Sequence, residues 1–230
     1  MSQLKAVLFD LDETLMARGQ AVLRLIERMI DDFGPGFGVR DHDEIKRIVQ
    51  QADGGGYRPK HEMYAELEDR LAWTGAPGWP AFQAYYRRVY PTCAVLEEGT
   101  LDVLTYFREK GLKLGLITNG ETAVQQKKLD LLGIGQKFDS VVISESAGCK
   151  KPDPHIFRLS MSELGVSPNA AWYVGDHPRN DVYGAWCAGL RAVWKSDVHP
   201  WDVTLPVIPY GIIRQLTDVI RLYEKRNTAG

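Results

Sequence analysis

Short runs of apolar residues with the character of buried strands recur along the chain, and they constrain its fold more than any other feature. Five such runs lie at residues 6–9, 112–117, 140–143, 171–174 and 191–194, and most are followed by a helical pattern. A strand that is apolar along its whole length is typical of a parallel sheet, whose crossovers are usually helices. The sequence therefore predicts an α/β fold with a doubly wound parallel sheet of the Rossmann-like kind.

The stretch from residue 17 to residue 95 breaks this alternation and contains no convincing strand. Apolar residues recur there at helical spacing in four segments, which begin near Val22, Ile45, Met63 and Phe82. Turns rich in glycine and proline separate these segments. We therefore expect two domains: a Rossmann-like core of residues 1–16 and 96–230, and an inserted all-helical cap domain of residues 17–95 over the end of the first strand.

The composition argues against several classes of partner. With 28 Lys and Arg against 30 Asp and Glu, the net charge is -2, which gives no basic surface for a nucleic-acid polymer. No segment approaches the roughly 20 apolar residues of a membrane span, and Asp10 comes before any apolar stretch long enough for a signal peptide. The three cysteines form no Cys-x-x-Cys pair, so we expect neither a disulfide framework nor a zinc site. These features predict a cytoplasmic monomer or homodimer that binds no membrane.

The first predicted strand runs directly into two carboxylates, Asp10 and Asp12. Open α/β sheets bind ligands at the carboxyl ends of their strands, and side chains two residues apart on an extended segment point the same way. Two unit charges about 4 Å apart interact with about 4 kcal/mol at an effective dielectric constant of 20. The pair therefore needs a cation or a proton, unless the two aspartates merely cap the following helix.

The next two strands end in groups that can bind phosphate. Thr118, Asn119 and Gly120 follow the second strand, where a hydroxyl and a glycine-flanked turn can donate to phosphate oxygens. The third strand leads into Lys-Lys-Pro-Asp-Pro, in which Lys151, next to the first proline, can neutralise a phosphate and an attacking carboxylate together; Lys150 is the fallback. Taken singly, these segments also fit a helix cap and a solvated surface lysine.

A second acidic pair, Asp176 and Asp181, lies in Gly-Asp-His-Pro-Arg-Asn-Asp at the end of the fourth strand. Carboxylate oxygens are ligands that Mg²⁺ prefers, although a loop with a helix cap would look similar. The occurrence of all four segments at successive strand ends favours one site for phosphate and magnesium.

As a set, these motifs resemble those of the haloacid dehalogenase-like hydrolases over nearly the whole chain. The inserted helices are similar to those of the helical-cap phosphatases of that family. The segment Phe-Asp-Leu-Asp-Glu-Thr-Leu and a helical tail after Tyr210 are similar to bacterial nucleotide and flavin-mononucleotide phosphatases. The resemblance implies a phosphatase that hydrolyses small-molecule phosphate monoesters, with Mg²⁺ as cofactor, through an aspartyl-phosphate intermediate.

The resemblance also implies a role for each matching residue. Asp10 would be the nucleophile, and Asp12 would be the general acid and base. Thr118 and the backbone beside Asn119 would hold phosphate oxygens. Lys151 would offset charge on the nucleophile and on the phosphoryl group.

The implied magnesium ligands are the Asp10 and Asp176 carboxylates and the backbone carbonyl of Asp12. Asp181 would support these ligands. The chain departs from many family members at Glu13, where they carry glycine.

Other functions remain open at this point. A phosphomutase would use the same intermediate and is the main alternative. A dehalogenase is disfavoured because members with that activity lack the second aspartate, here Asp12. A receiver domain would carry its phosphorylated aspartate on a middle strand, and a non-catalytic phosphate-binding module would be expected to have lost one of the key residues. The turn at residues 53–61 is either a substrate contact or a solvated turn.

Overall fold

The structure is a computed structural model that describes residues 3–227. It divides into two compact units. One comprises the residues up to Ala17 together with those from Val95 onward, and the other comprises Arg18–Ala94.

Six parallel strands form the sheet of the first unit, in the order β3-β2-β1-β4-β5-β6. They are β1 (Ala6–Phe9), β2 (Lys113–Thr118), β3 (Ser140–Ile143), β4 (Ala171–Gly175), β5 (Arg191–Lys195) and β6 (Gly211–Ile213). The predicted α/β class with a parallel sheet is confirmed. Because β1 pairs with β2 on one side and with β4 on the other, the carboxyl ends of these three strands are neighbours.

The sequence pattern predicts five of these strands and misses β6. This strand has three residues, of which only Ile213 is buried, so it lacks the continuous apolar run of a central strand. It occupies the place directly after Tyr210 where a helical tail is expected, and the helix α10 (Asp218–Asn227) follows it. The expected helical tail is therefore wrong in its first residues.

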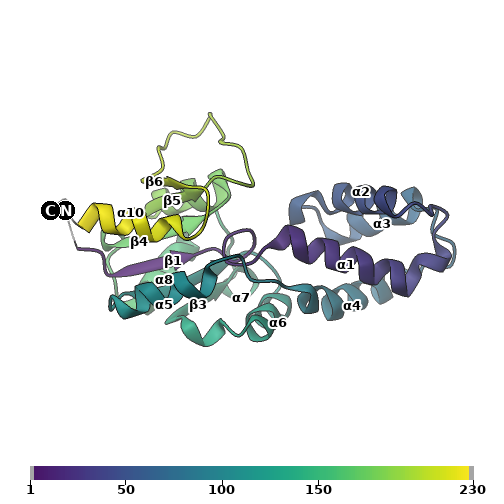
Figure 1. Cartoon of the computed structure of the whole chain (residues 1–230), viewed down its shortest axis with the longest axis horizontal. Coiled ribbons are helices and arrows are strands. Elements are labelled where there is room, and N and C mark those ends of the chain that lie inside the picture. Colours follow the sequence, from purple (N-terminus) through teal and green to yellow (C-terminus); the bar gives the residue numbers. More distant parts are fainter. Residues whose placement is uncertain (1–2, 228–230) are drawn as a thin grey trace. The chain divides into compact units, whose positions relative to one another are not determined.

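Helices cover both faces of this sheet. Successive side chains of a strand point to opposite faces, so each strand contributes residues to both layers. Ala6 and Leu8 of β1 belong to a buried cluster with residues of α8 (Pro154–Leu164) and α9 (Gly184–Cys187). Phe9 faces the other way and contacts Phe107 of α5 (Thr100–Glu109), which in turn contacts Tyr223 of α10. Figure 1 shows α5 and α10 in front of the sheet.

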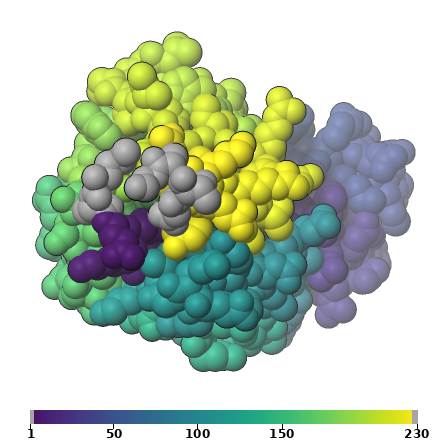
Figure 2. All heavy atoms as spheres, turned by 60° about the vertical axis from the view of Figure 1, so that its left-hand side comes forward, coloured from purple at the N-terminus to yellow at the C-terminus, as the bar shows by residue number. Residues whose placement is uncertain are grey.

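Two further helices follow strands of this unit: α6 (Thr122–Leu132) comes after β2, and the short α7 (Ser144–Ala147) comes after β3. Figure 2 shows the C-terminal segment (yellow) on the surface beside the teal segment that contains α5. No helix within residues 3–227 is both long enough and apolar enough to cross a bilayer.

The second unit is helical, with α1 (Arg18–Phe33), α2 (His42–Asp53), α3 (Lys60–Arg70) and α4 (Trp79–Val89). Local signals set the bounds of α2: the Asp41 side chain caps its start by accepting a hydrogen bond from the Glu44 N–H at 2.7 Å, and Gly54 ends it in a left-handed conformation. The core of the unit is aromatic. The rings that contact Trp73 are those of Phe33, Phe37, Tyr64 and Phe82.

Candidate active site

Lys151 lies at the centre of a buried group of charges at the carboxyl ends of β1 and β4. Its Nζ atom donates to Asp10 Oδ1 at 2.5 Å, to Asp181 Oδ1 at 2.7 Å and to the Tyr173 hydroxyl at 2.9 Å. The side chains of Lys151, Asp10 and Asp181 are 3%, 8% and 2% exposed. The adjacent Lys150 is exposed, so the fold itself distinguishes the two lysines.

Two local features fix the segment from Lys151 to the start of α8. Asn119, at the end of β2, accepts from the Lys151 N–H at 2.9 Å and donates to the Lys151 carbonyl at 3.0 Å. Asp153 caps α8 by accepting from the His155 N–H at 2.8 Å, and Pro154 occupies the first helical position, where its missing N–H is harmless. The Asn119 side chain therefore ties the lysine loop to the neighbouring strand end.

Three carboxylates gather beside this lysine. One oxygen from each of Asp10, Asp176 and Asp181 lies within 4.8 Å of the others, and all three residues are buried. Gly175 makes room for this arrangement, since a Cβ atom there would lie 2.4 Å from Asp181 Cγ. The backbone N–H of His177 donates to Asp181 Oδ2 at 2.9 Å and fixes its orientation.

The electrostatics of the cluster reflect an excess of negative charge. Burial raises the pKa of Asp10 to about 7, with Lys151 opposing the shift and Asp181 adding to it. Burial, then Asp181 and Asp10, raise the pKa of Asp176 to about 9. Burial would lower the pKa of Lys151, but the two aspartates outweigh it and raise this pKa. One ammonium does not offset three buried carboxylates, so the oxygen-rich set fits a divalent cation such as Mg²⁺.

Asp12 is not a member of this carboxylate cluster, although it lies two residues from Asp10. Its carboxylate accepts hydrogen bonds from Lys128 Nζ at 2.8 and 3.1 Å and from Gln125 Nε2 at 2.9 Å. Gln125 Nε2 also donates to the Thr118 hydroxyl at 2.5 Å. Gln125 of α6 thus links Asp12 to Thr118, and Lys128 of the same helix contacts Asp12 alone.

The sequence pattern gives no role to Gln125, Lys128 or Tyr173. For α6 the signal appears only when burial is known: the buried residues of the helix are Val124, Gln125, Lys128 and Leu129, and two of the four are polar. Polar side chains on the buried face of a helix require partners, which points to a site. Tyr173 carries no such signal, because a tyrosine within an apolar strand is ordinary.

Comparisons with known proteins show the family to which the chain belongs. The family model of haloacid dehalogenase-like hydrolases matches residues 4–189. The chain belongs to the haloacid dehalogenase-like hydrolases. It is 32% identical to a glyceraldehyde 3-phosphate phosphatase of Methanopyrus kandleri, over 95% of this chain and 97% of the relative. It is also 32% identical to a phosphoserine phosphatase of Thermus thermophilus, over 83% of this chain and 88% of the relative.

A solved structure of the same family shares the fold. The phosphatase from Thermococcus onnurineus superposes with a TM-score of 0.68 at 27% identity, over 96% of this chain and 98% of the other. Together with the curated relatives, this likeness makes the chain a phosphoric monoester hydrolase of the haloacid dehalogenase-like family.

The backbone at Glu13 explains why glycine is common there in the family. Glu13 has a φ of 63°, in the left-handed region that costs a residue with a Cβ atom roughly 1–2 kcal/mol. The sharp turn between β1 and α1 requires this conformation. Glu13 therefore adopts a conformation that glycine would adopt without this cost.

The glycine-rich turn of the helical unit has its cations in internal ion pairs. Asp53 is buried and accepts from Arg18 at 2.5 Å and from Lys60 at 2.9 Å, while Arg58 pairs with Glu66. A Cβ atom at Gly56 would lie 2.8 Å from the Arg18 guanidinium, so a larger residue there would displace this side chain. These contacts give the turn a structural role.

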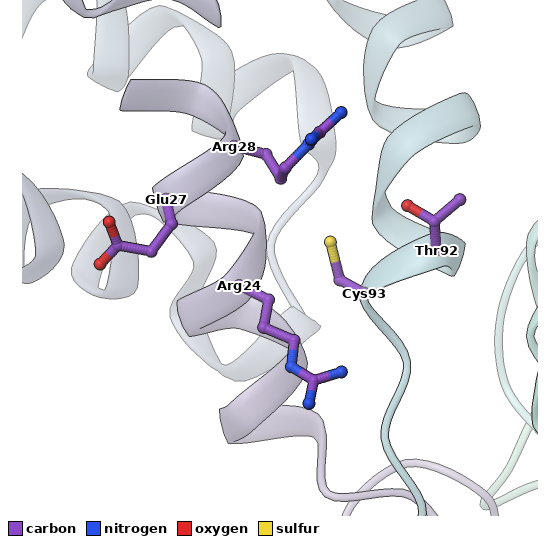
Figure 3. A pocket seen from close by; sticks show the side chains of 5 residues that line it. All are labelled: Arg24, Glu27, Arg28, Thr92 and Cys93. Carbon is purple, nitrogen blue, oxygen red and sulfur yellow. The ribbon is translucent and has the colours of Figure 1, made fainter. Parts of the chain in front are cut away.

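The helical unit also contains a cavity of about 470 Å³, lined by Arg24, Glu27, Arg28, Thr92 and Cys93. In Figure 3, Arg28 and Cys93 point into it, whereas Glu27 points away. Glu27 instead pairs with Lys46 at 2.8 Å. None of the residues implied by the family resemblance lines this cavity.

Proposed function

We propose that the chain is a magnesium-dependent phosphatase that hydrolyses small-molecule phosphate monoesters through an aspartyl-phosphate on Asp10, with Asp12 as general acid and base. The observation that carries this proposal is the buried contact of Lys151 with Asp10 and Asp181, in which segments 141 and 30 residues apart in sequence meet. Such a cluster is what transfer of a charged phosphoryl group requires, since its catalysis is mainly positioning and electrostatic stabilisation.

The proposed reaction has two displacements at phosphorus. In the first, Asp10 attacks through Oδ2, because Oδ1 accepts from Lys151; the P–O bond to the alcohol breaks, and Asp12 gives the alcohol its proton. In the second, Asp12 takes a proton from water, and the resulting oxygen nucleophile attacks the same phosphorus. The acyl phosphate bond breaks, which returns the Asp10 carboxylate and releases inorganic phosphate.

The other site residues act on the phosphate group. Lys151 offsets the negative charge that gathers on Asp10 and the phosphoryl oxygens. Thr118 and the backbone beside Asn119 hold two of those oxygens; the Asn119 side chain serves the Lys151 loop instead.

Asp10, Asp176 and the backbone carbonyl of Asp12 would hold Mg²⁺, and Asp181 orients Lys151 beside them. The bound ion would neutralise phosphate oxygens and the excess charge of the carboxylates.

We further propose that residues 1–16 and 96–230 are the catalytic core and that residues 17–95 are a cap that selects substrates. All the residues assigned above to chemistry belong to the first of the two compact units. A core that recognises only phosphate leaves the rest of the substrate to be recognised by other residues, and the helical unit is the available candidate.

The test is phosphate release by the purified protein from a panel of monoesters, with Mg²⁺ and with EDTA. The panel contains glyceraldehyde 3-phosphate, phosphoserine, nucleotides, flavin mononucleotide, phosphoglycolate and sugar phosphates. We expect Mg²⁺-dependent turnover and a loss of at least about 10³-fold in Asp10→Asn, because removal of the nucleophile eliminates the covalent route. Asp130→Asn, at an exposed position on α6, is the matched control.

Wild-type-like turnover by Asp10→Asn, or turnover that persists in EDTA, would contradict the proposal. Isomerisation of a sugar phosphate without release of phosphate would favour a phosphomutase instead.

A further inference from the structure

Helix α6 presents two adjacent matched pairs of residues, Gln125-Gln126 and Lys127-Lys128, with one member of each pair buried. Gln125 and Lys128 are 2% and 3% exposed, whereas Gln126 and Lys127 are exposed. A buried ammonium and a buried amide are costly without partners. Their partners are the residues assigned above to proton transfer and phosphate binding.

Lys128 contacts Asp12 with both carboxylate oxygens within 3.1 Å of Nζ. The Asp12 side chain is 22% exposed, so the pair lies at the boundary between the protein interior and the site. Buried ion pairs stabilise proteins little compared with apolar residues of similar volume. Stability alone is therefore a poor reason to bury Lys128 here, whereas a defined place for the Asp12 carboxylate is a direct consequence of the contact.

Gln125 links Asp12 to Thr118 by donating to both from its Nε2 atom. A hydroxyl has one hydrogen, so a Thr118 oxygen that accepts from Gln125 directs its own hydrogen elsewhere, and a phosphate oxygen is a suitable acceptor. Gly120 leaves the space for this contact: a Cβ atom there would lie 2.9 Å from Gln125 Cγ. The glycine of the Thr-Asn-Gly segment thus has a packing reason.

We propose that Lys128 and Gln125 are positioning residues of the phosphatase reaction, with Lys128 holding the Asp12 carboxylate in place and Gln125 orienting both Asp12 and the Thr118 hydroxyl. This inference rests on the proposed function, because it gives Asp12 its role as general acid and base. In this role neither residue has to bind the phosphate, because each acts through its neighbour.

The first experiment compares Lys128→Met with Lys127→Met, using the full chain and the substrate with the highest turnover. We expect kcat to fall about 10–100-fold in Lys128→Met, since a misplacement of about 1 Å can reduce a rate about 100-fold. The KM should stay within about twofold, because Lys128 does not touch the phosphate. Gln125→Leu should lower kcat about tenfold relative to Gln126→Leu, and it supplies a second variant if Lys128→Met fails to fold.

The second experiment is a double-mutant cycle with Asp12→Asn, measured with p-nitrophenyl phosphate, whose leaving group least needs a proton. If Lys128 acts through Asp12, Lys128→Met should change kcat less than twofold in the Asp12→Asn background. A role in stability alone would lower the folded fraction equally in both backgrounds.

The proposal is overturned if folded Lys128→Met and Gln125→Leu keep kcat within twofold of their controls. It is also overturned if Lys128→Met lowers kcat by the same factor in both backgrounds. Failure of the proposed function would look different: the wild type would lack Mg²⁺-dependent phosphate release, or Asp10→Asn would retain it.

Discussion

Lys151 is deeply buried and has two carboxylate partners. We therefore expect its replacement to affect catalysis more than replacement of its neighbour in sequence. Its ammonium meets Asp10 and Asp181 within 2.7 Å, in surroundings that water does not screen. Removing one member of a buried ion pair leaves an uncompensated charge behind. The Lys150 side chain, one residue away, is exposed, so it is a natural control for position and charge.

Replacement of Lys151 by methionine should therefore lower kcat by about 10²–10³-fold, the scale of losing one electrostatic donor to the transition state. Lys150→Met should keep kcat within about twofold of the wild type. Steady-state phosphate release checks both, with circular dichroism to confirm folding. Equal activities of the two variants would refute the assignment of the charge to Lys151.

Among the elements, the ends of three helices in the helical unit meet at one buried carboxylate. Asp53, the last residue of α2, accepts from Arg18 at the start of α1 and from Lys60 at the start of α3. Burial opposes ionisation of Asp53, but the two cations outweigh it and hold its pKa below 3.8. The triad sets the relative arrangement of α1, α2 and α3.

Asp53→Asn should reduce the free energy of unfolding of the protein by about 3 kcal/mol, because it leaves two cations without their partner. Asp69→Asn, at an exposed position on α3, should change it by less than about 0.5 kcal/mol. Urea unfolding at pH 7 measures both. A loss below 1 kcal/mol in Asp53→Asn would mean that the triad contributes little.

A comparison of the wild type with Asp53→Asn also predicts how the contribution of Asp53 to stability changes with pH. Since the folded-state pKa of Asp53 is lowered, its contribution is complete above the unfolded value of 3.8 and is lost as the pH falls through the folded value. The stability difference between wild type and Asp53→Asn should therefore shrink below about pH 3.8. A difference that grows on acidification has the wrong sign for this explanation.

At the scale of the whole molecule, we expect the three buried carboxylates of the sheet unit to make the stability of the fold depend on a divalent cation. Ligands that bind the folded state stabilise it by about 2.7 kcal/mol at a concentration 100 times Kd, which corresponds to a rise in Tm of about 5–10 °C for a chain of this size. The carboxylates repel one another without such a ligand.

Mg²⁺ should therefore raise the Tm of the wild type by several degrees and leave that of Asp176→Asn nearly unchanged. In EDTA, the two proteins should differ little in Tm, because a carboxyl with a pKa of about 9 is protonated at pH 7 and carries no charge that Asn would remove. Thermal unfolding followed by circular dichroism tests both statements. An equal Mg²⁺ response in the two proteins would place the ion elsewhere.

The alternation of apolar strands and helices determined the α/β class and the parallel sheet from the sequence alone, because burial on both faces forces a continuous apolar pattern. The motifs at the strand ends indicated the family, because each motif is a short segment that can be read directly from the sequence. The strand β6 could not be predicted, because three residues are too short to show a continuous apolar pattern.

Only the tertiary structure decided which distant groups meet. Lys151 contacts Asp10 and Asp181. Lys128 contacts Asp12, and Gln125 contacts both Asp12 and Thr118. The residues in these contacts are 7 to 141 positions apart in the sequence. Hydrophobic periodicity carries no information on such pairings, because it reports the face of an element that is buried and not its partner. The packing of β1, β2 and β4 side by side supplies that information.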